Sequence, residues 1–244
     1  MDTARPAPKI VFIPGFMQPA DAWAPVAERL GERYPRLLLD HREHTHEGRL
    51  REIAAAGEGA VLCGYSLGGR LALRAALADP GRYAGLITVG ATAGIEAPGE
   101  RARRSEADEK LASWMETQPI DQVVDVWERQ PLFADQSDAL VEAQRPGRLL
   151  QDPRHLALIL RTAGQGVLEP VWQQLHTLPV PVLAIAGGLD EGYADAAARM
   201  ARAVPHGRAE IVESAGHAPH LQRPDAVAAL LAEFLDEHLG QRVV

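Results

Sequence analysis

Ser66 lies in the Gly-Tyr-Ser-Leu-Gly sequence of residues 64–68, between a short apolar run and a segment with helical periodicity. We predict a strand over 60–63 and a helix over 67–78. The glycines allow a sharp turn where strand and helix crowd together, and the helix N-terminus favours negative charge beside it. The pattern is typical of a nucleophile elbow, although Ser66 could simply cap the helix. A catalytic interpretation therefore requires an acid, a histidine and an oxyanion donor elsewhere in the chain.

Two further polar residues follow predicted strands and could complete this chemistry. Asp190 lies just beyond the predicted strand 182–186, and His217 lies beyond the predicted strand 209–212. Because sites form at the carboxyl ends of parallel strands, the three side chains can meet at one edge of a sheet. His217 would take the Ser66 proton, while Asp190 would hold the imidazole tautomer and stabilise its charged form.

The acid and the histidine both have alternatives close by. Glu191 and Asp195 are alternative acids, and the alternative role for Asp190 is to cap a turn. His220 lies three residues after His217. We favour His217 because the glycine before it permits a loop that aims the ring, whereas His220 would orient that loop or face solvent.

An oxygen that gains negative charge in the reaction needs N–H donors. Leu67, directly after the serine, supplies one at the start of the predicted helix. Phe16 supplies the other, because it lies in the turn after the predicted strand 9–13. One such donor is typically worth about 3–4 kcal/mol in the transition state.

Strands and helices alternate along most of the chain. This alternation predicts an α/β fold with a mostly parallel, doubly wound sheet. We predict strands over 9–13, 36–40, 60–63, 86–90, 182–186 and 209–212, and helices over 20–30, 50–56, 67–78, 100–116, 120–130, 137–144, 154–162, 195–204 and 224–239.

The alternation breaks over residues 95–178, where only helical periodicity occurs. A helical insertion of this size between two strands is typical of a lid, which carries specificity while the sheet carries chemistry. We therefore expect a single domain over 1–244 with a lid at approximately 95–178, after a loose tail at 1–8.

Composition narrows the function classes. The chain has 244 residues, 46% hydrophobic and 24% charged, as in soluble globular proteins. A formal net charge of −8 argues against a nucleic-acid partner. The chain has one cysteine, Cys63, which precludes an internal disulfide and fits a reducing compartment. We expect Cys63 to be a small buried apolar residue.

No apolar run reaches the roughly 18 residues of a membrane span, and the first eight residues lack a signal-peptide core. We expect a cytoplasmic enzyme.

The histidines of residues 41–47 suggest a metal site. His41, His44 and His46 alternate there with Glu43 and Glu47. Their spacing matches neither His-Glu-x-x-His nor a Cys/His zinc pattern. We therefore favour a solvated polar loop and predict no metal site.

The helical insertion is rich in arginine although the chain is acidic. Most of these side chains could be exposed helix charges, and Arg104 could pair with Glu100 or Asp108 one turn away. Alternatively, some could bind substrate carboxylates, for which guanidinium geometry is suited. Arg70 is the stronger candidate for the pocket, because it lies one turn from Ser66. The arginines of the insertion are Arg101, Arg103, Arg104, Arg145, Arg148, Arg154 and Arg161.

Several longer motifs make the chain similar to one family. They are Gly15-Phe16-Met17 with Trp23 downstream, Gly64-Tyr65-Ser66-Leu67-Gly68-Gly69-Arg70, Arg101-x-x-Arg104-x-x-x-Asp108, Trp127-x-x-Gln130-Pro131-Leu132-Phe133, Arg148-Leu149-x-Gln151, Leu160-Arg161-x-x-Gly164-x-Gly166, Gly187-x-x-Asp190-x-x-Tyr193 and Gly216-His217-x-x-His220. From Ile10 onward the chain resembles the α/β-hydrolase-fold synthases of menaquinone biosynthesis. These enzymes form 2-succinyl-6-hydroxy-2,4-cyclohexadiene-1-carboxylate by eliminating pyruvate.

The resemblance implies an α/β-hydrolase fold whose lid follows the sixth strand of the fold, and a triad of Ser66, Asp190 and His217. It implies that Ser66 acts as a base rather than an acylated nucleophile, while the oxyanion hole stabilises charge on the succinyl ketone oxygen. It implies a small polycarboxylate substrate and no metal or organic cofactor. The implied substrate-binding residues are Tyr65, Arg70, Arg104, Trp127 and Arg148.

The chain departs from the family pattern around one wall of the pocket. Pro14-Gly15 replaces the usual His-Gly, and 40–44 replaces the usual Asp-x-x-Gly-His-Gly loop. The segment 40–64 is shortened by roughly a dozen residues, and we expect the usual leading hairpin to be absent. Two alternatives therefore remain, a carboxylesterase or related serine hydrolase of small acyl substrates, and a non-catalytic ligand-binding relative.

Overall fold

One sheet of six strands organises the chain in the computed structural model, which describes residues 8–238. Its order is β2-β1-β3-β4-β5-β6, and each pair of neighbouring strands is parallel. The predicted α/β architecture is therefore confirmed. The strands are β1 (Ile10–Ile13), β2 (Arg36–Leu38), β3 (Val61–Tyr65), β4 (Gly85–Val89), β5 (Val182–Gly187) and β6 (Gly207–Val212).

The strand order reverses at β1, and this reversal places the site. From β1 the chain crosses to the edge strand β2 and then returns to β3 on the other side of β1. Ile13 pairs with Gly64, so β1 and β3 end side by side. Ligands of open parallel sheets bind at such a switch point, outside the carboxyl ends of the strands. The turn at Phe16 and the turn at Ser66 consequently face the same crevice.

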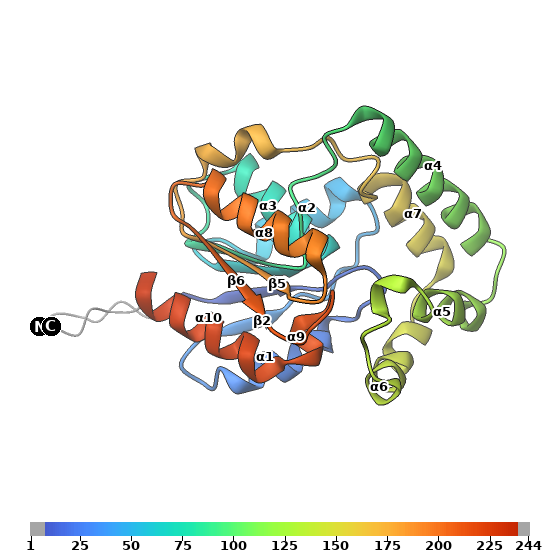
Figure 1. The fold of residues 1–244 in the computed structure, drawn as a ribbon, viewed down its shortest axis with the longest axis horizontal. Coiled ribbons are helices and arrows are strands. Elements are labelled where there is room, and N and C mark those ends of the chain that lie inside the picture. The colour runs from blue at the N-terminus through green and yellow to red at the C-terminus, as the bar shows by residue number, and fades with distance from the viewer. Residues whose placement is uncertain (1–7, 239–244) are drawn as a thin grey trace, which may run out of the picture.

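Helices cover both faces of the sheet (Figure 1). Among the described residues, no helix is both long and apolar enough to span a membrane. One face carries α1 (Ala24–Arg29), α9 (Pro219–Gln222) and α10 (Pro224–His238), and the other carries α2 (His46–Ala56), α3 (Leu67–Ala78) and α8 (Glu191–Ala203).

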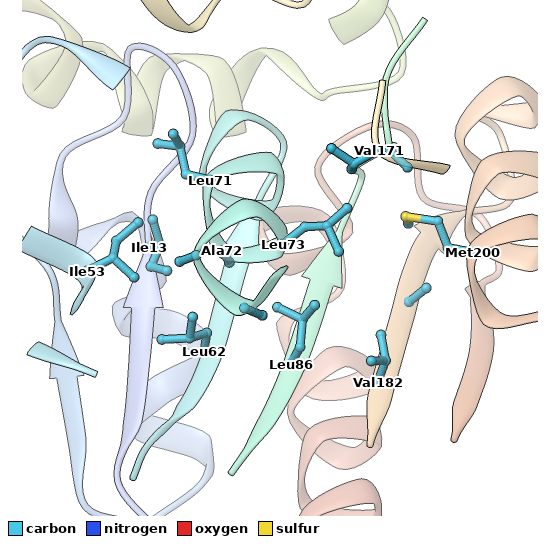
Figure 2. Close-up of a cluster of buried hydrophobic side chains, with 14 of the residues drawn as sticks. Ile13, Ile53, Leu62, Leu71, Ala72, Leu73, Leu86, Val171, Val182 and Met200 are labelled. Atoms are coloured by element: carbon cyan, nitrogen blue, oxygen red, sulfur yellow. The ribbon is translucent and has the colours of Figure 1, made fainter. Parts of the chain in front are cut away.

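Alternate residues of each strand enter two separate cores. Leu62 and Leu86 pack with Leu71 and Ala72 of α3 on one face (Figure 2). Their neighbours in the strands, among them Cys63, pack on the other face with helices α1 and α10. This two-residue period explains why the strands read as continuous apolar runs, since both faces are covered. Cys63 is fully buried, as its position in a central strand predicts.

A helical insertion separates β4 from β5. It contains α4 (Pro98–Met115), α5 (Ile120–Glu128), α6 (Asp138–Leu149) and α7 (Pro153–Ala163), with short 3₁₀ turns at Pro131–Phe133 and Trp172–Thr177. The helices share a small core of their own, which includes Met115, Val124 and Leu156. Trp172 and Leu175 instead join the core of the sheet, so the last part of the insertion belongs to the layer of α3 and α8.

Several element boundaries differ from the prediction; helix α8, for example, begins at Glu191 rather than at residue 195. Helix α2 begins at His46 rather than at residue 50, because the Thr45 hydroxyl caps it by accepting the Gly48 N–H. Helix α6 continues through Pro146 to Leu149 instead of ending near residue 144. The predicted helix 20–30 opens with a 3₁₀ turn, Ala20–Trp23, before α1. Residues 1–7 of the predicted tail 1–8 and the last residue of the predicted helix 224–239 lie outside the described residues.

Candidate active site

Ser66 occupies a strained turn between β3 and α3. Its φ of 48° and ψ of −110° lie outside the regions that L-residues favour, and such strain is typical of functional sites. A Cβ on Gly64 would lie 2.3 Å from the Gly68 carbonyl oxygen, and one on Gly68 would lie 2.4 Å from that of Ile13. Only glycine fits at either position. Strand, turn and helix therefore pack closely enough to present the Ser66 hydroxyl at the end of the sheet.

His217 connects the serine to an aspartate. Its Nε2 lies 3.1 Å from Ser66 Oγ, and its Nδ1 lies 2.7 Å from Asp190 Oδ2. The Asp190 carboxylate can only accept at Nδ1, so the neutral ring carries its proton there and leaves Nε2 to accept from the serine. Neither Ser66 nor Asp190 makes a side-chain capping bond to the helix that it precedes. The structure thus brings these three predicted side chains together, while Glu191 and Asp195 remain exposed.

His220 is fully buried, so the expectation that it could face solvent is wrong. Its ring lies between those of Trp23 and Tyr65, with centroid distances of 4.6 and 4.2 Å. Burial, with the nearby His217, lowers the pKa of His220 to about 3, so the ring is neutral at ordinary pH. Its Nε2 lies 3.4 Å from the Gln18 amide nitrogen.

The turn after β1 runs from Gly15 to Gln18. Gln18 N–H donates to the Gly15 carbonyl oxygen across 3.3 Å, and Met17 takes a φ of 57°. Within residues 8–238, neither the Phe16 N–H nor the Leu67 N–H has an acceptor. Leu67 is the first residue of α3, whose opening N–H groups have no partner inside the helix. Both predicted oxyanion donors are therefore available beside the serine.

Ser66 and His217 line a cavity of about 100 Å³ under the insertion. It adjoins a larger cleft of about 740 Å³ that reaches Asp190 and Tyr193. All ten residues that we predicted from the sequence contact one of these two spaces. The cavity is lined by Phe16, Tyr65, Ser66, Leu67, Arg70, Arg104, Trp127, Arg148 and His217, among others, and the cleft by Asp190.

The three cavity arginines differ in their partners. Arg104, at the rim with its side chain 45% exposed, donates to Asp108 and Gln165. Arg148 is buried and donates to Glu128 and Gln144. Arg70 donates only to the backbone carbonyl of Ala163, across 3.2 Å, and no carboxylate of residues 8–238 lies within ion-pair distance of it.

Arg70 therefore holds a half-buried positive charge that has no counter-charge among residues 8–238. Burial lowers the pKa of its guanidinium to about 10, which leaves it protonated at neutral pH. A buried unpaired charge is costly in free energy. A carboxylate bound in the cavity would offset that cost.

Other arginines of the insertion pair outside the cavity. Arg101 pairs with Glu169, Arg145 with Asp125 and Glu128, and Arg161 with Glu109 and Glu116. For these side chains the interpretation as helix-surface charges is correct.

Sequence reasoning assigned no role to several residues that shape the site. Tyr193 places its ring 4.4 Å from that of His217, and Phe133 lies under the Arg148 guanidinium. Gln18 and Gln144 line the cavity. Tyr193 and Phe133 stand in two of the longer motifs, but Gln18, Gln144 and Glu128 carry no local signal.

The histidine cluster is more ordered than a solvated loop, so that interpretation is wrong for part of it. The His41 side chain is only 2% exposed, and its Nδ1 lies 2.7 Å from Glu52. His44 stacks on His155 of α7 with 3.6 Å between ring centroids. Within residues 8–238, no three His, Cys, Asp or Glu side chains are grouped so as to hold a metal ion.

The chain also matches known proteins. A sequence model of the alpha/beta hydrolase family matches residues 10–230. The chain belongs to the alpha/beta hydrolase family. This alpha/beta hydrolase is 29% identical over 249 residues to "2-succinyl-6-hydroxy-2,4-cyclohexadiene-1-carboxylate synthase" of Enterobacter sp. (strain 638), covering 93% of this chain and 92% of the relative.

A second relative aligns over a shorter stretch. The "Putative 2-succinyl-6-hydroxy-2,4-cyclohexadiene-1-carboxylate synthase" of Bacillus subtilis (strain 168) is 34% identical over 177 residues. The match covers 71% of this alpha/beta hydrolase and 65% of the relative, slightly less than two thirds of its length.

Solved structures share the fold. MenH from S. aureus superposes with a TM-score of 0.87 at 24% identity, covering 97% of this alpha/beta hydrolase and 96% of that chain. A thermophilic esterase from Thermogutta terrifontis superposes with a TM-score of 0.77 at 21% identity, with coverages of 95% and 90%.

Proposed function

We propose that the protein is a carbon–oxygen lyase that eliminates pyruvate from a succinyl-cyclohexene-carboxylate precursor in menaquinone biosynthesis. The product would be 2-succinyl-6-hydroxy-2,4-cyclohexadiene-1-carboxylate. The observation that carries the proposal is the half-buried Arg70 guanidinium, which lines the same cavity as Ser66 and has no carboxylate partner among residues 8–238. A substrate with several carboxylates would supply its missing counter-charge. The names of the Enterobacter and Bacillus relatives support the same reaction.

In the proposed reaction Ser66 is a base. It removes a ring proton from the substrate and passes its own proton to His217, whose positive charge Asp190 stabilises. The electron pair of the broken C–H bond forms a ring double bond, and the C–O bond to the pyruvyl group breaks. The leaving group takes up a proton and departs as pyruvate. Negative charge that builds on the succinyl ketone oxygen meets the N–H groups of Phe16 and Leu67.

Five further side chains bind the substrate in this proposal. Arg70 binds a carboxylate directly, whereas Arg104 and Arg148 first have to share or exchange their carboxylate partners. Tyr65 and Trp127 pack against the ring as walls of the cavity. This arrangement divides substrate recognition between the sheet edge and the insertion.

The insertion acts as a lid within a single domain in this proposal. Arg104 comes from α4, Trp127 from α5 and Arg148 from α6, and all three line the cavity that contains Ser66. Helices that lie over the sheet edge would exclude water from the reacting atoms. Specificity would therefore depend on the insertion as well as on Arg70 of α3.

A carboxylesterase is the second candidate. The 3.1 Å contact between Ser66 Oγ and His217 Nε2 would equally serve attack on an ester carbonyl. Leu132 and Leu160 give part of the cavity an apolar wall that suits a small acyl group. Both reactions place charge on a carbonyl oxygen, so the sheet edge alone does not separate them.

One assay separates the two reactions. The purified protein is supplied with the enzymatically generated pyruvyl precursor and, in parallel, with a short-chain aryl ester. We expect pyruvate release to exceed ester hydrolysis by orders of magnitude in kcat/KM. Ester turnover without pyruvate release would overturn the lyase proposal.

A further inference from the structure

The Gln18 side chain joins the oxyanion turn to a buried histidine. Its Oε1 accepts the Gly15 N–H across 3.2 Å, and its Nε2 lies 3.4 Å from His220 Nε2. Gln18 also lines the cavity that contains Ser66. One half-buried amide therefore bridges the turn after β1 and helix α9, which begins two residues after His217.

This contact fixes the direction of each hydrogen bond. The Gly15 N–H can only donate, so the amide oxygen must face it and the amide nitrogen must face His220. Because the amide nitrogen can only donate, His220 Nε2 must accept and the ring proton must lie on Nδ1. The depressed pKa of His220 agrees with a neutral ring.

The His220 ring is itself held firmly. Trp23 and Tyr65 pack against it, and Trp23 Nε1 donates to the carbonyl oxygen of Ile13, the last residue of β1. Tyr65 directly precedes the serine. His220 is therefore fixed relative to both the end of β1 and the nucleophile turn, and it can transmit this position to Gln18.

We infer that Gln18 and His220 are positioning residues for the oxyanion turn. By accepting the Gly15 N–H, Gln18 ties down the first donor of a turn that also contains the strained Met17. The next N–H, that of Phe16, is left without an acceptor in the described chain and available to the developing oxyanion. A donor contributes fully only when it is aimed at the oxyanion in advance. The inference rests on the proposed oxyanion role of Phe16, but it holds for the lyase and the esterase alike.

Substitution of Gln18 tests the inference. Gln18→Leu should lower kcat about tenfold to a hundredfold, less than the loss of a whole donor, with KM within about twofold. Gln18→Glu keeps an acceptor for Gly15 but faces His220 Nε2 with a second acceptor. The ratio of its kcat to the kcat of the unchanged protein should rise as the pH falls. Protonation of the new carboxylate would let it donate a hydrogen bond to His220 Nε2. The other ionisable groups facing the cavity, Tyr65, Arg70, Arg104, Asp108, Arg148, Tyr193 and His217, are common to both proteins, so the ratio isolates position 18.

The controls separate positioning from folding and from the choice of reaction. Gln173→Leu makes the same change at an exposed site and should leave kcat and thermal unfolding unchanged. The series is measured on whichever substrate the unchanged protein turns over. Absence of pyruvate release would therefore overturn the lyase proposal. The kcat values of the Gln18 variants on the ester, relative to the unchanged protein, would still test whether Gln18 positions the oxyanion turn.

A second measurement needs no turnover. Nitrogen-15 NMR of the unchanged protein should show His220 Nε2 unprotonated and Nδ1 protonated. A proton on Nε2, or a folded Gln18→Leu protein with unchanged kcat, would overturn the inference.

Discussion

The sheet edge and the helical insertion both supply polar groups to the cavity, but they hold them differently. At the sheet edge, Ser66 is fixed by a backbone turn, and His217 is bonded on both ring nitrogens. In the insertion, Arg104 and Arg148 are held by carboxylates of the insertion itself. Arg70, on the sheet side, has no such partner among the described residues.

This difference indicates a division of labour. Backbone geometry holds reacting atoms in place whatever the charge of the ligand, and suits groups that transfer protons. An ion pair compensates the charge of an arginine and orients its guanidinium group until a bound anion competes for it. The sheet edge would then determine the rate of the chemical step, and the insertion together with Arg70 of α3 would determine which anion enters.

The largest expected effect falls on the sheet edge. Ser66→Ala should lower kcat by about 10⁴-fold or more, because within residues 8–238 only Ser66 Oγ lies within hydrogen-bond distance of His217 Nε2. Substrate affinity, measured by calorimetry, should change little. If substantial turnover remained, groups of the insertion would be carrying the chemistry and the comparison would fail.

Matched core truncations compare the stability of the two regions. Leu86→Ala in the sheet and Met115→Ala in the insertion each remove a fully buried side chain, at a typical cost of about 2–5 kcal/mol. We expect Leu86→Ala to lower hydrogen-exchange protection throughout the chain. Met115→Ala should lower it first in α4 and α7, because the small core of the insertion can open locally. Equal loss of protection in β3 and β4 would show that the two regions unfold together.

The arginines allow a sharper test. Arg70→Gln should lower kcat/KM about tenfold to a hundredfold, since a hydrogen bond to a charged group is worth about 1.5–3 kcal/mol. Arg104→Gln should have a smaller effect, because Asp108 already competes for that guanidinium. Arg161→Gln, whose partners lie on the outer surface of the insertion, serves as the control. Unchanged kinetics for both Arg70 and Arg104 variants would refute the anion pocket.

The smallest expected effect is on the pH dependence of stability at the sheet edge. The pKa of His220 is about 3 in the folded protein and about 6.5 in an unfolded chain, so the unfolded chain binds more protons between these values. The neutral His220 ring therefore contributes fully to the free energy of unfolding above pH 6.5, and this contribution is lost as the pH falls toward 3. At pH 5 the loss is about 2 kcal/mol relative to pH 8.

Urea unfolding at pH 8 and pH 5 measures this contribution. The decrease should be about 2 kcal/mol smaller in His220→Gln than in the unchanged protein. His206→Gln, which alters an exposed histidine, should behave as the unchanged protein does. A His220→Gln protein with the full decrease would show that this buried ring is not the group responsible.

The sequence alone determined the parts of the protein that depend on local order. Short apolar runs specified the strands of the sheet. The glycines at 64 and 68 specified the turn at Ser66, because only glycine fits where two backbone segments approach each other so closely. The order of Ser66, Asp190 and His217 after three of the strands, β3, β5 and β6, was enough to select the three side chains that the structure brings together, since parallel strands end at one edge.

Only the tertiary structure decided how charges and buried polar groups are paired. Glu128 lies 20 residues from Arg148, and Gln18 lies 202 residues from His220. No periodicity connects such positions, so the sequence could not separate the unpaired Arg70 from the paired arginines or predict that His220 is buried. Partner choice at this range depends on distances of a few ångströms between segments that meet only after the sheet and the insertion have packed.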